Sequence, residues 1–420
     1  MIRFFNGRVL TMANGTAITN DEVWVEGDKI AYVGPAKEDL PAFERQIDLQ
    51  GHLLMPGFKN AHAHTAMTFV RSMADDLPLQ EWLFNRIFPL EAKLTSEDIY
   101  DFTRLGILEY LSSGITGSFD MYYNRAAYVQ ANIDCGFRST VCGGSAAYEI
   151  ISDEYKKYNS SSDLIRYIPG IHAEYTTSAE EFAAVQQLCK ENKAPCFAHN
   201  AETFDEVEQC MERREGLSPT EYMDSLGLFD YGGGGFHCVW MGDKDLKIFK
   251  DKGLWAVTCP GSNAKLASGI APIQRMMDLE LNLAIGTDGA SSNNALDMFR
   301  EMYLVCVLQK LRQSNAASCP ADKVLEMACV GSARAMGRAD CDSIAVGKQA
   351  DLIVIDLDRP NMRPLLNIPK NLVYSGSKEN VRLTMVAGKV LYEKGEFFVG
   401  EEPGKIYESC QKLVERLMAG

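Results

Sequence analysis

Short apolar segments alternate with longer helical stretches through the middle of this chain, from about residue 56 to residue 344. This alternation predicts parallel β-strands connected by helices. Eight such units within about 290 residues match a (β/α)8 barrel of the TIM type, which is an α/β fold. The predicted strands span residues 57–61, 115–119, 139–142, 168–172, 195–199, 235–239, 255–259 and 283–287.

The two ends of the chain follow a different pattern. They contain short alternating segments, such as Ile2–Phe5 near the start and Val381–Leu391 near the end, which are typical of antiparallel strands. The strands near the start are too few to bury a core alone. We therefore expect residues 1–55 and 345–420 to form one composite β-sandwich domain with a C-terminal helix. Residues 56–344 would form the barrel inserted between its two parts.

Five of the six histidines lie at or just beyond the ends of predicted strands. In a TIM barrel these ends meet at one face, where active sites are built, so the five imidazoles should converge. The first two are two residues apart, which would place them on one face of a strand. Imidazole is a common metal ligand near neutral pH. The five are His62, His64, His172, His199 and His237, and we assign no role to His52.

Asp288 follows the last predicted strand. A carboxylate placed after an apolar run is costly unless it is paired or bound to a cation, although an Asx-turn at Asp288-Gly289 is a structural alternative. With His62, His64 and His199 it forms a set of three nitrogen ligands and one oxygen ligand that leaves positions open for water and substrate. This set predicts one divalent metal ion, for which Zn²⁺ is suited and Fe²⁺ and Mn²⁺ are alternatives. Such an ion makes hydroxide available near neutral pH.

Two further residues are candidates for proton transfer. Glu202 follows His199 by three residues, so its carboxylate can face the open side of the metal without binding it. The alternative is a solvated carboxylate in the first turn of a helix. His237 is the remaining neutral base or hydroxide-orienting donor. The glycines at 232–235 before it predict either a close backbone approach or a loose loop.

Composition argues against several other classes of protein. A net charge of -15 disfavours a nucleic-acid partner, because phosphate binding needs a basic face. The sequence shows neither a signal-peptide pattern nor an apolar run of membrane-spanning length, so we expect no membrane association. The twelve cysteines include no C-x-x-C pair. They are expected to be buried free thiols in a protein of the reducing cytoplasm.

The sequence resembles the amidohydrolase superfamily, in particular the branch of 5'-methylthioadenosine/S-adenosylhomocysteine deaminases and the related triazine hydrolases. The resemblance covers essentially the whole chain, and its motifs are specific. It rests on residues 56–68, which contain the two histidines His62 and His64, and on residues 199–203, 237–240, 259–269, 286–294 and 344–356.

The resemblance implies a mononuclear metal site made of His62, His64, His199 and Asp288. It also implies Glu202 and His237 as catalytic partners. His172 stands at the end of the fourth strand, where a lysine would be needed for a carbamate-bridged metal pair. The implied reaction is hydrolytic deamination of an aminopurine. Hydroxide oriented by His237, and formed with help from Asp288, attacks C6 while Glu202 gives a proton to N1 and ammonia leaves.

The substrate-selecting residues follow from the same resemblance. Residues 76–91 are similar to the nucleoside-recognition segment of adenosine-type deaminases. This similarity makes Trp82 a contact for the 5' substituent, Glu91 an acceptor for the ribose hydroxyls and His172 a purine contact. Local sequence alone favours a core tryptophan and a helix-surface glutamate instead. The implied substrate is a small purine nucleoside, namely adenosine, 5'-deoxyadenosine, 5'-methylthioadenosine or S-adenosylhomocysteine.

The sequence departs from the family members that accept S-adenosylhomocysteine. Those members bind the carboxylate of its amino-acid tail with arginines after the third strand, whereas residues 139–165 contain only Lys156 and Lys157 as cations. Lysine is the poorer bidentate partner for a carboxylate. Glu174 could repel the tail or form a salt bridge. We therefore expect a preference for uncharged 5' groups.

Two alternatives stay open from sequence. The same site could deaminate a free base, a pterin or a triazine, or the chain could be a non-catalytic scaffold of the same fold. The presence of every ligand and acid/base candidate argues against the scaffold. The oligomeric state is also open, and the β-rich ends and residues 361–376 are candidates for contacts in a homo-oligomer.

Overall fold

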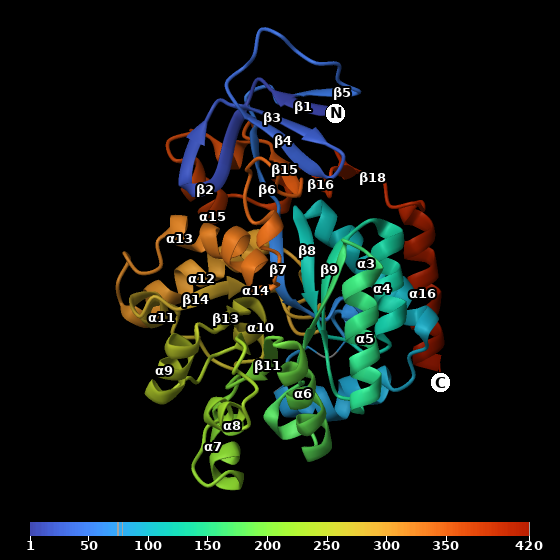
Figure 1. The fold of residues 1–420 in the computed structure, drawn as a ribbon, viewed down its shortest axis with the longest axis vertical. Helices are drawn as coiled ribbons and strands as arrows, with labels where there is room; N and C mark the ends of the chain where they lie inside the picture. The colour runs from blue at the N-terminus through green and yellow to red at the C-terminus, as the bar shows by residue number, and fades with distance from the viewer. Residues whose placement is uncertain (74, 78, 420) are drawn as a thin grey trace.

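Eight parallel strands form two four-stranded sheets in the computed structural model, which describes residues 1–73, 75–77 and 79–419 (Figure 1). The sheet orders are β10-β9-β8-β7 and β11-β12-β13-β14. A parallel bridge between Gly170 and Phe197 joins the sheets at one edge. At the other edge the Asp288 N–H donates to the His62 carbonyl at 3.0 Å. The strands are β7 (Phe58–Ala63), β8 (Ile115–Asp120), β9 (Arg138–Gly143), β10 (Ile165–Pro169), β11 (Cys196–Asn200), β12 (Gly233–His237), β13 (Trp255–Thr258) and β14 (Asn282–Ile285).

Each of the eight predicted strands has a counterpart, but two are displaced along the chain. β10 ends at Pro169 instead of residue 172, and β12 begins at Gly233 instead of residue 235. A Cβ on Gly234 would lie 2.1 Å from the carbonyl oxygen of Trp255, so only glycine lets these backbones approach. The loose-loop alternative for the glycine run is therefore wrong.

One buried cluster takes a side chain from each of the eight parallel strands. These side chains are Ala61, Phe119, Cys142, Ile168, Phe197, Phe236, Val257 and Ala284. The ring of His62 stacks on Phe236, with 3.9 Å between the ring centroids. The cluster thus forms a close-packed apolar layer on which His62 packs.

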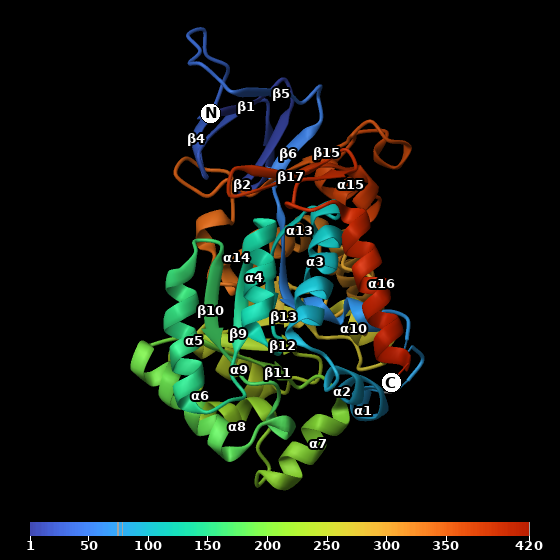
Figure 2. The same cartoon turned by 90° about the vertical axis from the view of Figure 1, so that its right-hand side faces the viewer.

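Helices follow the strands, and several of them lie along the outer side of the two sheets, whereas the helices of residues 204–225 lie beyond the C-terminal ends of the strands (Figure 2). Several begin with a capping box, as at Thr95–Asp98 and Thr203–Glu206, which satisfies the free N–H groups of the first turn. These helices are α3 (Ser96–Ser112), α4 (Arg125–Cys135), α5 (Tyr148–Ser161), α6 (Ala179–Asn192), α7 (Phe204–Arg213), α8 (Pro219–Ser225), α9 (Asp243–Lys252), α10 (Pro260–Lys265), α11 (Ile273–Asp278), α12 (Met298–Gln313), α13 (Ala321–Glu326) and α14 (Ser332–Ala335). Two short helices precede them, α1 (Leu79–Trp82) and α2 (Phe88–Glu91).

The two chain ends share a six-stranded sheet of order β18-β17-β16-β15-β6-β2, while β4-β3-β1-β5 form a second sheet. The link is the antiparallel pairing of β6 with β15, which places Pro56 opposite Leu352. One buried cluster includes side chains from both ends, such as Phe4 and Leu383. The strands are β1 (Ile2–Phe5), β2 (Arg8–Thr19), β3 (Glu22–Glu26), β4 (Lys29–Gly34), β5 (Arg45–Asp48), β6 (Leu53–Pro56), β15 (Leu352–Ile355), β16 (Val381–Val386), β17 (Lys389–Glu393) and β18 (Glu396–Phe397).

Buried ion pairs connect the sheets formed by the two chain ends to the N-terminal ends of the parallel strands. Arg138, the first residue of β9, donates to both oxygens of Asp351 at 2.7 and 2.9 Å. Lys59 Nζ lies 3.4 Å from the same carboxylate, and the three side chains have no exposed surface. Despite the opposing effect of burial, these cations hold the pKa of Asp351 well below its usual range. The C-terminal ends of the strands face away from this junction.

Two helices complete the chain. α15 (Ile368–Tyr374) lies between β15 and β16 in sequence, and α16 (Pro403–Ala419) packs along α3 (Figure 2). All twelve cysteines are free and buried, as predicted. Within the described ranges, no helix is both long and apolar enough to cross a membrane.

Candidate active site

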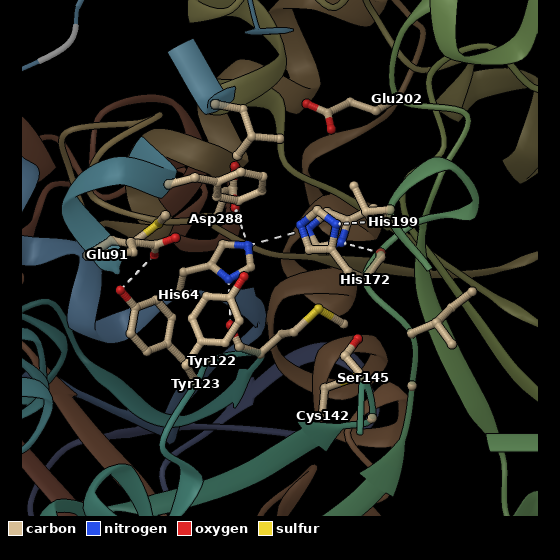
Figure 3. A pocket seen from close by; sticks show the side chains of 18 of the residues that line it. His64, Glu91, Tyr122, Tyr123, Cys142, Ser145, His172, His199, Glu202 and Asp288 are labelled. Atoms are coloured by element: carbon tan, nitrogen blue, oxygen red, sulfur yellow. Dashed lines mark hydrogen bonds and ion pairs between the residues drawn. The ribbon is translucent and has the colours of Figure 1, made fainter. Parts of the chain in front are cut away.

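The predicted site residues meet at a cavity of about 350 Å³ at the C-terminal ends of the parallel strands. The members that line it are His64, Trp82, Glu91, His172, His199, Glu202, His237 and Asp288. His62 is fully buried beside them, with its ring centroid 4.9 Å from that of His64 and 4.8 Å from that of His199. Figure 3 shows the cavity with Glu91 on one side of His64 and with His172 and His199 on the other.

Two groups of side chains have metal-ligand spacing, namely His62 with His64 and His199, and His62 with His237 and Asp288. His64 Nε2 lies 3.3 Å from His199 Nε2 and 3.2 Å from Asp288 Oδ1, and His62 Nε2 lies 3.5 Å from the same oxygen. Ligand atoms bound to a tetrahedral ion at about 2.1 Å are about 3.4 Å apart. These three separations therefore fit pairs of ligands of one divalent ion.

The hydrogen bonds on the far sides of two rings leave their Nε2 atoms available to a metal. His64 Nδ1 donates to the Met121 carbonyl at 2.6 Å, and His199 Nδ1 donates to the His172 carbonyl at 2.7 Å. A neutral imidazole that donates from Nδ1 carries a lone pair on Nε2. With both rings neutral, their Nε2 lone pairs face each other at 3.3 Å and repel unless a cation lies between them. His62 needs a partner as well, because neither of its buried ring nitrogens has one among the described residues.

His62 and His64 meet for a reason that differs from the prediction. β7 ends at Ala63, so the two histidines do not share one face of a regular strand. The pairing of β7 with β8 is irregular between Asn60 and Ala63. Irregular strand pairing, such as a β-bulge, changes the direction of neighbouring side chains and is common next to active sites.

The two carboxylate oxygens of Asp288 make different contacts. Oδ2 accepts hydrogen bonds from the hydroxyls of Ser262 at 2.7 Å and Ser292 at 2.6 Å. Oδ1 faces the histidine nitrogens. Because both oxygens are engaged by side chains of the site, the geometry favours the ligand interpretation over the Asx-turn alternative.

Glu202 lies beside the metal-ligand cluster. Its Oε2 is 3.7 Å from His237 Nε2. The side chain is buried, and burial raises its pKa, so it is not the solvated carboxylate of the alternative interpretation. Its backbone N–H donates to Oε2 of Glu206 at 2.7 Å, and Glu206 belongs to the capping box of α7. The start of α7 therefore holds Glu202 in place.

Backbone strain is concentrated in the same region. Ala201, His237 and Asp288 have φ values of +51°, +68° and +61°. This left-handed conformation costs about 1–2 kcal/mol for a residue with a side chain, and such residues cluster at functional sites. Here the three turns place the side chains of Glu202, His237 and Asp288 at one cavity.

Trp82, Glu91 and His172 all line the cavity, although Glu91 was expected at a helix surface on local sequence alone. Tyr122 donates a hydrogen bond to Glu91 Oε1 at 2.7 Å, and burial raises the pKa of Glu91 to about 7. His172 Nδ1 is 2.7 Å from the Thr176 hydroxyl. These contacts leave the second carboxylate oxygen of Glu91 and Nε2 of His172 for a ligand.

The sequence analysis missed several cavity residues, among them Tyr122, Arg125 and Glu181. Arg125 Nε donates to Glu154 at 2.7 Å. The position of two of them in the chain could have identified them. Tyr122 and Arg125 lie shortly after the C-terminal end of β8, where barrels place site residues. Glu174 is not among the cavity-lining residues, and its buried carboxylate forms salt bridges with the partly exposed Arg213 at 2.6 Å and Arg214 at 2.7 Å.

The fold and the site define an amidohydrolase, and the chain belongs to that family, whose model matches residues 53–391. The chain is 35% identical to a 5'-deoxyadenosine deaminase of Methanosarcina mazei, over 99% of this chain and 98% of the relative. It is also 35% identical to a 5-methylthioadenosine/S-adenosylhomocysteine deaminase of Pyrococcus furiosus, over 98% of this chain and 99% of the relative. A solved adenosine deaminase from Xanthomonas campestris with bound zinc superposes with a TM-score of 0.94 at 29% identity and covers 100% of this chain and 99% of its own.

Proposed function

We propose that this protein is a metal-dependent aminohydrolase that deaminates adenosine-type nucleosides to the inosine analogue and ammonia. The substrates are adenosine, 5'-deoxyadenosine and 5'-methylthioadenosine, with S-adenosylhomocysteine as a weaker one. The observation that carries the proposal is the meeting of histidine and aspartate side chains with metal-ligand spacing, a buried carboxyl group at Glu202 and a second carboxyl group at Glu91 around one cavity. The relatives named above support the substrate class.

The four side chains His62, His64, His199 and Asp288 would hold the ion. When bound, a divalent ion would lower the pKa of water towards about 7 and supply hydroxide at neutral pH. We propose Zn²⁺, because three imidazoles and one carboxylate suit it and the neighbour from Xanthomonas campestris contains zinc. Metal analysis of the purified protein distinguishes it from Fe²⁺ and Mn²⁺.

The proton-handling residues have separate roles in this proposal. The raised pKa of Glu202 lets its carboxyl group hold a proton for N1 of the purine. His237 Nε2, 3.7 Å from Glu202 Oε2, orients the attacking water. Asp288, held by two serine hydroxyls, accepts a proton from it. The net reaction forms a bond from water oxygen to C6, breaks the C6–N bond and releases ammonia.

The architecture proposed from sequence also receives support. We propose that the two parallel sheets are halves of one closed (β/α)8 barrel, because contacts join both pairs of edge strands and one core cluster takes a residue from each strand. We propose further that residues 1–55 and 345–420 form the composite β-sandwich domain, which the pairing of β6 with β15 supports. Residues 56–344 form the catalytic domain.

The first test compares adenosine, 5'-deoxyadenosine, 5'-methylthioadenosine and S-adenosylhomocysteine in an ultraviolet deamination assay on protein of known metal content. Among the described residues that line the cavity, Arg125 is the one lysine or arginine, but it is paired with Glu154, and Glu181 lines the same cavity. This end of the cavity thus offers no net positive charge for a carboxylate. We expect kcat/KM for 5'-methylthioadenosine to exceed that for S-adenosylhomocysteine by at least about tenfold. Similar values would contradict the preference.

Glu91→Ala tests whether the protein acts on nucleosides or on free bases. If Glu91 binds the ribose hydroxyls, its loss removes charge-assisted hydrogen bonds and should lower kcat/KM for nucleosides by about 10–100-fold. Turnover of adenine or guanine, if any, should change little. Glu81→Ala is the control, since Glu81 is an exposed carboxylate of the same segment. Equal losses for nucleosides and free bases would favour a free-base, pterin or triazine deaminase.

A further inference from the structure

The segment that follows β13 contacts three proposed catalytic side chains at once. It comprises residues 259–269, whose sequence is Cys-Pro-Gly-Ser-Asn-Ala-Lys-Leu-Ala-Ser-Gly and of which only Ser262 has a role in the function proposed above. Ser262 Oγ donates to Asp288 at 2.7 Å, and Ser268 Oγ donates to Glu202 at 3.3 Å. Between them, Asn263 Oδ1 lies 2.8 Å from Nδ1 of His237.

The contact between Asn263 and His237 selects one form of the imidazole ring. Both side chains are 1% exposed, so water does not compete for the bond. The side chain of Asn263 presents its amide oxygen to this ring nitrogen, and because an amide oxygen only accepts hydrogen bonds, this arrangement places a proton on Nδ1 of His237. The neutral ring then has its lone pair on Nε2, the atom that faces Glu202. The other neutral tautomer would bring two lone pairs together at the Asn263 contact.

The segment itself is anchored from behind the site. Glu301 accepts a hydrogen bond from the backbone N–H of Gly261 at 2.8 Å, and a Cβ at Gly261 would lie 2.5 Å from Glu301 Oε1. Lys265 donates to the Ser291 carbonyl at 3.1 Å and pairs with Asp75. These contacts fix the backbone on both sides of Asn263, and an asparagine on a fixed backbone can hold a neighbouring ring in one orientation.

We propose that Asn263 is a positioning residue that fixes the Nδ1–H tautomer of His237. The ring then directs Nε2 into the cavity, where it accepts a hydrogen bond from the attacking water. The kinetic part of this inference rests on the proposed deaminase function. The tautomer is a property of the protein alone and is measured separately.

The kinetic test compares Asn263→Ala with Asn263→Asp on metal-loaded protein. Loss of the acceptor should lower kcat by about 10–100-fold, the usual effect of removing a residue that orients a functional histidine, with little change in KM. An aspartate side chain would keep an acceptor at the same place, so Asn263→Asp should recover most of the loss. The control is Asn132→Ala, because Asn132 is a buried asparagine whose Nδ2 donates to Tyr128 in α4, outside the cavity. Equal kcat losses in Asn263→Ala and Asn132→Ala, or a loss in Asn263→Asp as large as in Asn263→Ala, would overturn the proposal.

The tautomer is read directly by ¹⁵N NMR of histidine-labelled protein loaded with Zn²⁺. Six histidines give a small set of signals, and the spectrum of His237→Gln identifies those of His237. We expect a protonated Nδ1 in the wild-type protein and a mixture of tautomers in Asn263→Ala. An unprotonated Nδ1 in the wild-type protein would refute the inference even if Asn263→Ala failed to fold. Absence of deaminase activity in the wild-type protein would refute the proposed function and leave this measurement intact.

Discussion

Asp288→Asn should abolish detectable deamination and weaken metal binding at the same time. Asparagine keeps the shape of the side chain but removes the negative charge that Oδ1 presents to the His62 and His64 nitrogens at 3.5 and 3.2 Å. It also removes the proton acceptor. We expect kcat/KM to fall by about 10³-fold or more, because general-base and ligand functions are lost together. The measurements are the ultraviolet assay and metal content after dialysis.

Asp245→Asn is the matched control for this substitution. Asp245 is a buried carboxylate that accepts a hydrogen bond from the Gly242 N–H at 2.7 Å, and it does not line the cavity. Its amide variant should retain metal and turnover, apart from a loss of stability. Full activity in Asp288→Asn would exclude Asp288 as ligand and base. Equal metal loss in both variants would show that the effect is general destabilisation.

Glu202→Gln should separate metal binding from catalysis. Glu202 is buried and close to His237 Nε2, but it belongs to neither group of side chains with metal-ligand spacing. Glutamine has nearly the same volume and no transferable proton. We therefore expect kcat to fall by about 10²–10⁴-fold, the range for loss of a general acid, with stoichiometric metal retained. Single-turnover kinetics together with metal analysis check both parts.

The control for Glu202 is Glu174→Gln. Glu174 is equally buried and carries two salt bridges, to Arg213 and Arg214, but it lies outside the cavity. Its substitution should lower the unfolding temperature and leave kcat nearly unchanged. A Glu202→Gln variant with more than a tenth of wild-type kcat would remove Glu202 from the mechanism.

Much of the site was predictable from sequence, for a geometric reason. Parallel strands in an α/β protein end at one edge, so residues that follow different apolar segments are brought together whatever their separation in the chain. This rule placed His199 and Asp288 in one site although 88 residues lie between them. The exact strand ends were less predictable, because β10 stops before His172 and β12 begins within the glycine run.

The sequence by itself determined which residues follow the apolar segments, and through them the kind of chemistry that this protein can support. Only the tertiary structure decided which atoms of those residues face one another. The Nδ1 atoms of His64 and His199 donate hydrogen bonds to the backbone carbonyls of Met121 and His172. These bonds orient the two rings so that their Nε2 atoms face each other. The tertiary structure also brought Arg125 into the cavity and Asn263 to His237. These contacts depend on residues that are distant in the chain, so the local pattern of apolar and polar residues does not predict them.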